Sequence, residues 1–195
     1  MRFLRVDLRA FALVLAPILV GWLFLVLTDR TGPDEGIYAE SPKLTLYKLP
    51  RPVEGRDLSF SDLTAATVVS PDPPIGGTPP GVRSFFIVGP HGAPATTFAG
   101  TAEIYVVTVD AGDPRATPRL TKIPSRVHRV NARTYQIVPD TDLAWTEQSP
   151  VYQQYFQALA TTDARRSTLE VSAALVLSDS SRGTQRIYPV RLCPI

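Results

Sequence analysis

The sequence predicts a mainly β protein, in which a single N-terminal transmembrane helix precedes an antiparallel β-sandwich or partly open barrel-like domain with one short amphipathic helix. The first observation behind this prediction is an uncharged apolar run from Ala10 to Thr28. The second is a series of short strand-like segments with turn residues between them, because a parallel α/β sheet would need a helix between most strands. The third is the presence of 19 prolines in 195 residues, about twice the usual share, which disfavours long helices.

The apolar run is interpreted as an uncleaved signal anchor. As a helix rising 1.5 Å per residue it would span roughly 28 Å, close to the thickness of the hydrocarbon core of a bilayer. It is longer than the apolar region of a cleaved signal peptide, and no small-x-small cleavage pattern follows it. Arg2, Arg5 and Arg9 precede the run, and acidic residues predominate after it. We therefore expect a bacterial inner (cytoplasmic) membrane protein with a cytoplasmic N-terminus and a periplasmic C-terminal domain.

Two residues inside the run predict more than anchoring. Pro17 removes a backbone hydrogen bond and favours a kink, and Gly21 lets a neighbouring helix approach closely. An anchor alone needs neither, so both residues predict packing against helices of other integral membrane subunits, with neutral drift as the alternative. The predicted regions are a cytoplasmic N-terminus at 1–9, the transmembrane helix at 10–28, a polar stalk at 29–42 and an extracytoplasmic β-rich domain at 43–195.

Alternation of apolar and polar residues, together with β-branched content, places the strands of the domain. The expected strands are residues 43–49, 84–88, 101–109, 119–123, 126–130, 134–138, 168–177 and 184–192. The last two are predicted to form a hairpin around the sequence SDSSRG. Pro189 places the final strand at a sheet edge or at a bulge, because proline donates no ladder hydrogen bond.

One amphipathic helix is expected after Ser149, which can cap it, with Pro150 in its first turn. The side chains that recur with the spacing of one buried helical face are Tyr152, Tyr155, Phe156 and Leu159. By contrast, the proline- and glycine-rich residues 70–81 fit neither a helix nor an inner strand.

No pattern typical of a catalytic or metal site is present in the sequence. No G-x-S-x-G motif occurs, so a nucleophilic triad would have to use His91 or His128, and the segment around His128 lacks an orienting carboxylate. Zinc and copper sites need clustered ligands that this chain does not show in sequence. Asp110 and Asp113 lack the glutamate of a calcium loop and are expected to form a turn. We therefore expect a protein that is not an enzyme and has no cofactor or metal.

Two glutamates and the single cysteine are further candidates for a site. Glu103 and Glu170 lie inside strong strands and are expected to face solvent, away from the apolar side. Cys193 is the only cysteine, which excludes an intramolecular disulfide. It is either a small apolar residue or an intermolecular thiol.

Charge is concentrated in one segment. The formal net charge is only +2, yet the following cations occur with no acid between the first and the last of them: Arg115, Arg119, Lys122, Arg126, Arg129 and Arg133. This segment predicts a docking site for an acidic partner surface or for anionic lipid headgroups. The alternative is a solvated face of two edge strands, whose charges prevent edge-to-edge pairing. The overall charge balance gives no indication of nucleic-acid binding.

These observations predict a non-catalytic, single-pass accessory or structural subunit of a larger membrane protein complex. Energy-transducing respiratory and photosynthetic assemblies are examples of complexes with such subunits. The alternatives are a free-standing, membrane-anchored periplasmic assembly factor or ligand-binding module, and an anchored hydrolase. The expected partners are the lipid bilayer and other integral membrane subunits.

Overall fold

The structure is a computed structural model that describes residues 33–68, 80–91, 100–113, 115, 117–161 and 168–192. Its contacts divide the chain into a unit Met1–Asp34 and a unit Glu35–Ile195, and every element below belongs to the second unit. Within the described ranges no helix is both long enough and apolar enough to cross a membrane. The predicted transmembrane run 10–28, with Pro17 and Gly21, lies outside the described residues, as does Cys193.

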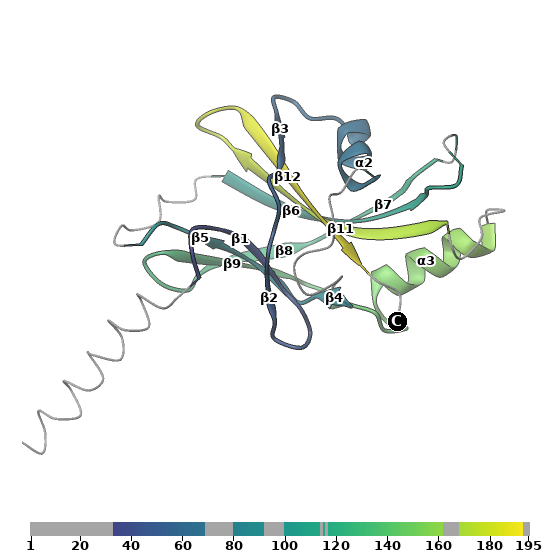
Figure 1. Ribbon diagram of the computed structural model, residues 1–195, viewed down its shortest axis with the longest axis horizontal. Coiled ribbons are helices and arrows are strands. Elements are labelled where there is room, and N and C mark those ends of the chain that lie inside the picture. Colours follow the sequence, from purple (N-terminus) through teal and green to yellow (C-terminus); the bar gives the residue numbers. More distant parts are fainter. Residues whose placement is uncertain are drawn as a thin grey trace, which may run out of the picture. The chain divides into compact units, whose positions relative to one another are not determined.

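Two antiparallel sheets form the body of the second unit (Figure 1). The first has the order β2-β1-β5-β9-β8 and consists of β1 (Gly36–Glu40), β2 (Leu46–Lys48), β5 (Ser84–Val88), β8 (Ser125–Arg129) and β9 (Thr134–Pro139). The second has the order β3-β12-β11-β6-β7 and consists of β3 (Val53–Gly55), β6 (Gly100–Asp110), β7 (Arg119–Ile123), β11 (Leu169–Asp179) and β12 (Thr184–Leu192). A short pair, β4 (Gly81–Val82) and β10 (Leu143–Ala144), lies beyond the β5–β9 ladder. The predicted mainly β, antiparallel class is confirmed.

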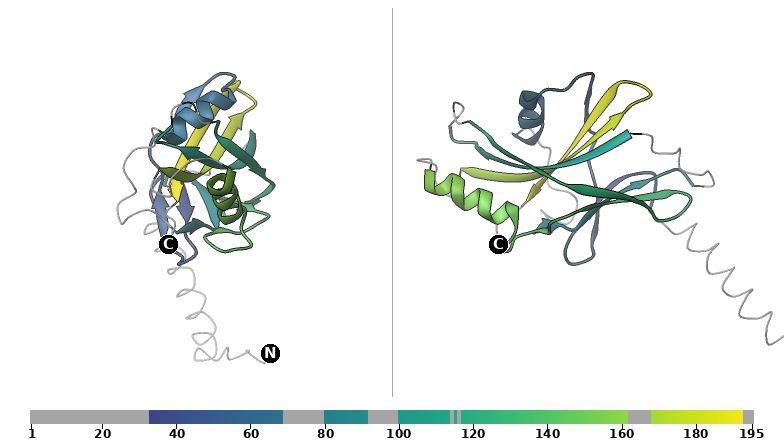
Figure 2. Two further views of the ribbon diagram at one scale, coloured as in Figure 1. Left: turned by 90° about the vertical axis from the view of Figure 1, so that its right-hand side faces the viewer. Right: turned by 180° about the vertical axis from the view of Figure 1, so that it is seen from behind.

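The chain passes between the two sheets at both of their edges. The outer strands β7 and β8 are joined by Pro124 alone, which we call the short corner; Figure 2 shows the chain running from one sheet into the other there. The outer strands β2 and β3 are joined by residues 49–52, the long corner. Both corners contain proline. Proline is tolerated there because a residue that leaves a ladder needs no N–H donor. Such corners give a sandwich some features of a partly open barrel.

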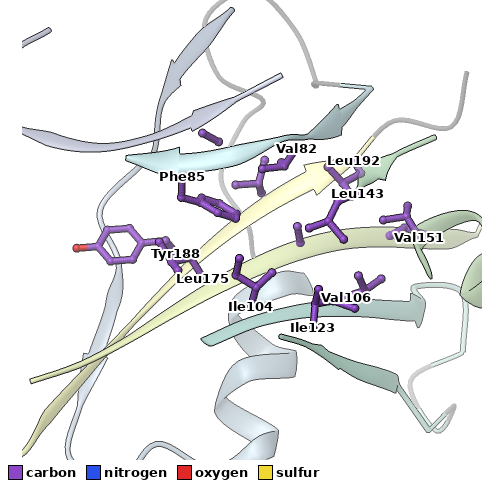
Figure 3. Packing of buried hydrophobic residues seen from close by; sticks show 14 of the residues in the cluster. Val82, Phe85, Ile104, Val106, Ile123, Leu143, Val151, Leu175, Tyr188 and Leu192 are labelled. Carbon is purple, nitrogen blue, oxygen red and sulfur yellow. The ribbon is translucent and has the colours of Figure 1, made fainter. Parts of the chain in front are cut away.

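One hydrophobic core lies between the two sheets (Figure 3). Phe85 and Ile137 enter it from the first sheet, and Ile104 and Val106 enter it from the second. In β11 the residues that alternate into this core are those that the sequence placed on one side, namely Leu169, Val171, Ala173, Leu175 and Leu177.

A second, smaller core lies on the outer face of the second sheet, beneath α2 (Phe60–Val68). Leu63 and Ala66 of this helix pack against Ala174 and Val176 of β11. The sequence pattern predicted a single helix in the domain, and α2 was not predicted. The residues that should have identified it are a capping box: the Ser59 N–H donates to Asp62 Oδ2 at 2.6 Å, and the Asp62 N–H donates to Ser59 Oγ at 3.3 Å.

The predicted helix is α3 (Pro150–Thr161), and it begins as expected. The Tyr152 N–H donates to Ser149 Oγ at 3.2 Å, which makes Ser149 the cap. The buried residues are Val151, Gln154, Tyr155 and Ala158, whereas Tyr152, Phe156 and Leu159 are half-buried. The buried face is therefore rotated from the predicted one and includes a glutamine.

The domain begins earlier than the sequence analysis placed it. Residues 36–40, assigned to the polar stalk, form β1, which pairs with β5 along its whole length and buries Tyr38 and Ala39. The predicted strand 43–49 is shortened to β2, because residues 41–45 form a turn in which Leu44 has a φ of 59°. The compact unit thus starts at Glu35.

The position of Pro189 agrees with its prediction. It lies opposite Ala174 of β11 on one side, whereas β3 pairs with β12 only as far as Ile187. In the described part of the chain, β12 is locally an outer strand at Pro189, so the missing N–H is tolerated.

Candidate functional site

The predicted cationic segment lies along the edge where the chain turns at the short corner. We define the basic edge as β7 and β8 with their cations Arg119, Lys122, Arg126 and Arg129. Each strand is outermost in its sheet, so one side of its backbone has no strand partner among the described residues. Val127 is 41% exposed and Val130, directly after β8, is 55% exposed. The edge therefore combines cations, apolar side chains and open backbone.

Acids from other strands neutralise part of this edge. Lys122 Nζ lies 2.5 Å from Glu103 Oε1 on β6, and Arg126 Nε lies 2.8 Å from Asp140 Oδ1 after β9. The Lys122 and Arg126 side chains are more than half exposed, and pairs this exposed contribute about 0–1 kcal/mol each. The sequence segment holds no acid, so its charge overstates the charge that the folded edge presents.

The other two cations of the edge contact uncharged groups. Arg119 donates to Thr161 Oγ1 at the end of α3. The Arg129 guanidinium lies 6.0 Å from the centroid of the Tyr135 ring, and its Nε donates to the Asn131 carbonyl at 3.3 Å. Neither contact offsets the positive charge.

The two ends of the predicted segment lie apart from the basic edge. Arg133 is only 7% exposed; its Nη2 donates to the Gly89 carbonyl at 2.8 Å and its Nε to the Pro90 carbonyl at 2.9 Å. Arg133 thus ties the start of β9 to the end of β5. Arg115 is exposed in the connection between β6 and β7, where its N–H donates to Asp113 Oδ1 at 2.9 Å.

Glu103 and Tyr105 form a hydrogen-bonded pair of titratable groups whose pKa values are both shifted. The Tyr105 hydroxyl donates to Glu103 Oε2 at 2.6 Å. The hydrogen bonds from Lys122 and then from Tyr105 hold the pKa of Glu103 below its ordinary value. Burial, followed by the bond to Glu103, raises the pKa of Tyr105 to about 12. Both side chains line a hollow of about 180 Å³ beside α2, so Glu103 faces other side chains as well as solvent.

The histidines and aspartates considered for catalysis or metal binding make local contacts. His91 Nδ1 lies 2.8 Å from Arg133 Nη1, and because arginine only donates, this nitrogen accepts. His128 is exposed on β8 opposite Gln136. Asp110 Oδ1 accepts from the Gly112 N–H at 2.9 Å, which confirms the predicted turn. Across the described residues no group of three or more potential metal ligands is assembled.

A groove that the sequence did not predict opens between the two sheets beside the long corner. Its volume is about 570 Å³. Ile37 and Ile87 line it from the first sheet, and Leu177 and Tyr188 line it from the second. These residues come from β1, β5 and the β11–β12 hairpin, three segments far apart in sequence, so no local motif could have identified the groove.

Charged side chains surround these apolar walls. The lining contains the cations Lys48, Arg51, Arg182 and Arg186 and the acids Glu35 and Asp179. Asp179 is engaged locally, since it accepts from the Ser181 hydroxyl at 2.6 Å and lies 3.8 Å from Arg182. Hydrogen bonds from Ser181 lower the pKa of Asp179, which keeps it ionised. Cations outnumber acids around the groove.

Tyr188 connects the groove to the core. Its ring belongs to the main core cluster and is 5% exposed, and Figure 3 shows its hydroxyl at the end of the ring that points away from the other labelled residues. Burial raises the pKa of Tyr188, with Arg186 acting in the opposite direction. Tyr188 lines the groove, and its hydroxyl is a neutral hydrogen-bonding group there.

The sequence matches no protein-family model and no curated protein.

Proposed function

We propose that this protein is a non-catalytic, single-pass accessory subunit of a larger bacterial membrane complex. In this proposal residues 10–28 hold it in the inner membrane, and its β domain lies on the periplasmic side and docks onto another subunit through the basic edge. The observation that carries the proposal is that the outer strands of both sheets follow one another at this edge, with cations and exposed valines along them.

The chemistry of the edge favours a protein partner. An outer strand offers backbone N–H and carbonyl groups to an added strand, and Val127 and Val130 supply apolar contact area. Arg119 and Arg129 keep their charge unopposed by an acid in their described contacts, so an acidic surface on the partner would be steered toward them. Anionic lipid headgroups would use the charge but neither the valines nor the open backbone.

The titratable groups support a binding role over a catalytic one. His91 contacts Arg133, and Glu103 contacts both Tyr105 and Lys122. Each of these contacts supports the local structure, and none brings a base to a nucleophile within the described residues.

The experiment is native sizing of membranes solubilised in mild detergent, with the wild-type chain compared with a Val127→Asp/Arg129→Glu variant. We expect the wild type to migrate with a large assembly and the edge variant to be released from it. The matched control, Arg56→Glu, reverses an exposed charge outside the edge and should stay in the assembly. A wild-type chain that sizes as a free monomer or small oligomer would contradict the proposal.

Two additional measurements separate the parts of the proposal. If the edge variant stays in the assembly but loses binding to anionic vesicles, the edge contacts lipid and the protein-docking part is wrong. Gly21→Leu tests the helix: it should insert normally and weaken association with the complex, because a bulky side chain prevents close helix packing. If Gly21→Leu leaves the complex unchanged, the run is only an anchor.

A further inference from the structure

The groove beside the long corner joins an apolar interior to a cationic rim, and this combination selects a class of ligand. We propose that the groove binds an anionic single-chain amphiphile, such as a long-chain fatty acid, with the chain between the sheets and the head at the rim. This inference goes beyond the proposed function, since it concerns the domain alone and requires no partner complex.

The apolar part of the ligand would extend the core of the domain. Leu177 and Tyr188 are core residues, and Ile37 and Ile87 pack against that core from the opposite sheet. Ile37 and Ile87 are directly opposite each other in the β1–β5 ladder, so together they form one wall. A chain inserted here would cover the half-buried Ile37 and Ile87 and lie against Leu177 and Tyr188, which the core already buries.

The dimensions of the groove fit a narrow ligand. Its volume of about 570 Å³ lies within the range of small-molecule sites. Two facing sheets are about 10 Å apart and their side chains interdigitate, so a groove that opens between them at a corner is narrow and suits an extended hydrocarbon chain better than a folded peptide.

The cations at the rim of the groove favour a ligand with a negatively charged head group. Lys48 and Arg186 lie on strands of opposite sheets, so they can approach a head from two sides. Lys48 lies against the Tyr38 ring, with Nζ 5.8 Å from its centroid, and this contact leaves its charge available. The Tyr188 hydroxyl, which is hydrogen-bonded to Arg186, adds a neutral polar group to the same lining. Charge-assisted hydrogen bonds of this kind hold carboxylates and phosphates alike.

A glycine lets Lys48 reach this position. A Cβ on Gly36 would lie 2.8 Å from Lys48 Cε, and the φ of Gly36 is +155°. The side chain of Lys48 therefore passes directly over the Gly36 backbone at the rim. A larger residue at position 36 would require the end of the Lys48 side chain to shift.

The test is photolabelling of the full-length protein in phosphatidylcholine nanodiscs with a palmitate analogue that carries a diazirine in its chain. We expect labelled domain peptides to be those that contain Ile37, Ile87 and Leu177. Unlabelled palmitate and a single-chain phosphate amphiphile, added in separate arms, should each reduce labelling, and the stronger competitor identifies the head. Hexadecanol and acetate, which supply only the chain or only the head, should compete poorly.

Variants test the rim directly. Lys48→Gln/Arg186→Gln should lower the apparent affinity for the labelled palmitate about tenfold, the expected loss of charge-assisted contacts. The control variant Lys43→Gln/Arg56→Gln also removes one lysine and one arginine charge, at exposed positions outside the groove. It should change the affinity for palmitate little. Thermal unfolding of both variants checks that each remains folded.

Three results would overturn the inference: labelling spread evenly over the domain, competition by hexadecanol equal to that by palmitate, or equal behaviour of the two double variants. The outcome is separate from that of the sizing experiment. A chain that sizes as a monomer but is labelled in the groove would contradict the accessory-subunit proposal and support this one.

Discussion

The two corners where the chain changes sheets differ in length, and their surroundings differ with it. At the short corner the Asp140 N–H donates to the Pro124 carbonyl at 2.8 Å, and Ser125 Oγ donates to the Ala102 carbonyl of the opposite sheet at 3.3 Å. At the long corner the Leu49 N–H donates to the Ile37 carbonyl at 2.8 Å, and Pro50 and Pro52 then line the groove.

The comparison shows that the length of the connection between two sheets determines which kind of binding surface that edge of the sandwich presents. A single residue between strands brings the two ladders together, and the outside of those strands is left as a continuous surface. Four residues bridge the sheets at a distance, so the space between them stays accessible to a ligand. The short corner thus suits a docking edge and the long corner suits a binding groove.

The largest loss of stability should come from a substitution in the core that both edges share. Phe85 is fully buried between the sheets, and Phe85→Ala should lower the free energy of unfolding by about 3–5 kcal/mol through the cavity that it leaves. Urea unfolding followed by Trp145 fluorescence in a Trp22→Phe background measures this. A loss below about 1 kcal/mol would mean that the sheets do not depend on a shared core.

Arg133→Met should have a smaller effect that is concentrated at the groove. The substitution leaves the carbonyls of Gly89 and Pro90, both at the groove, without their guanidinium donor. Hydrogen bonds to charged groups contribute about 1.5–3 kcal/mol, so we expect a loss of about 2 kcal/mol in the same unfolding assay. We also expect weaker photolabelling of the groove, although Arg133 lies outside it. Unchanged labelling would show that the two regions are independent.

Gln154 offers a test that concerns only the basic edge. Its Nε2 donates to the Val106 and Arg119 carbonyls at 3.1 and 2.9 Å, and so fixes α3 to the start of β7. Gln154→Ala should cost about 1 kcal/mol, because its buried Oε1 has no hydrogen-bond partner and the native arrangement already carries that penalty. Gln153→Ala, at an exposed neighbouring position, is the control. Hydrogen exchange should increase in β7 and not in β2.

Local patterns predicted the strong elements well. The segments 84–88 and 119–123 are strands with the predicted bounds, and Ser149 caps α3 as its sequence indicates. These elements are specified by alternation and by capping, which act within a few residues. The missed β1 shows the limit: it is short, and Ala39 is buried because it enters the core between the two sheets, which the local sequence does not reveal.

The sites were harder to predict because they depend on which strands become neighbours. The cationic segment was identified as a run of charge, but Glu103 and Asp140, which pair with Lys122 and Arg126, come from outside it. Arg133 gave the same sequence signal as the others and is buried. Sequence alone therefore located the edge and overestimated its charge, and it contained no sign of the groove.

The smallest effect concerns the ion pair on the basic edge and appears as a pH dependence. The pKa of Glu103 is depressed in the folded state by its hydrogen bonds from Lys122 and Tyr105, so the carboxylate contributes stability above its ordinary pKa of 4.5. That contribution is lost as the pH falls below 4.5 and through the folded-state pKa. Because the pair is partly exposed, we expect less than about 1 kcal/mol at neutral pH.

Glu103→Gln should therefore flatten the stability profile below pH 4.5 and leave the profile near neutrality almost unchanged. Urea midpoints measured from pH 3 to pH 7 provide the test. Glu147→Gln, at an exposed position away from the edge, serves as the control and should retain the wild-type slope. If Glu103→Gln keeps that slope as well, Lys122 is free in solution, and the basic edge presents more charge to a partner than its contacts indicate.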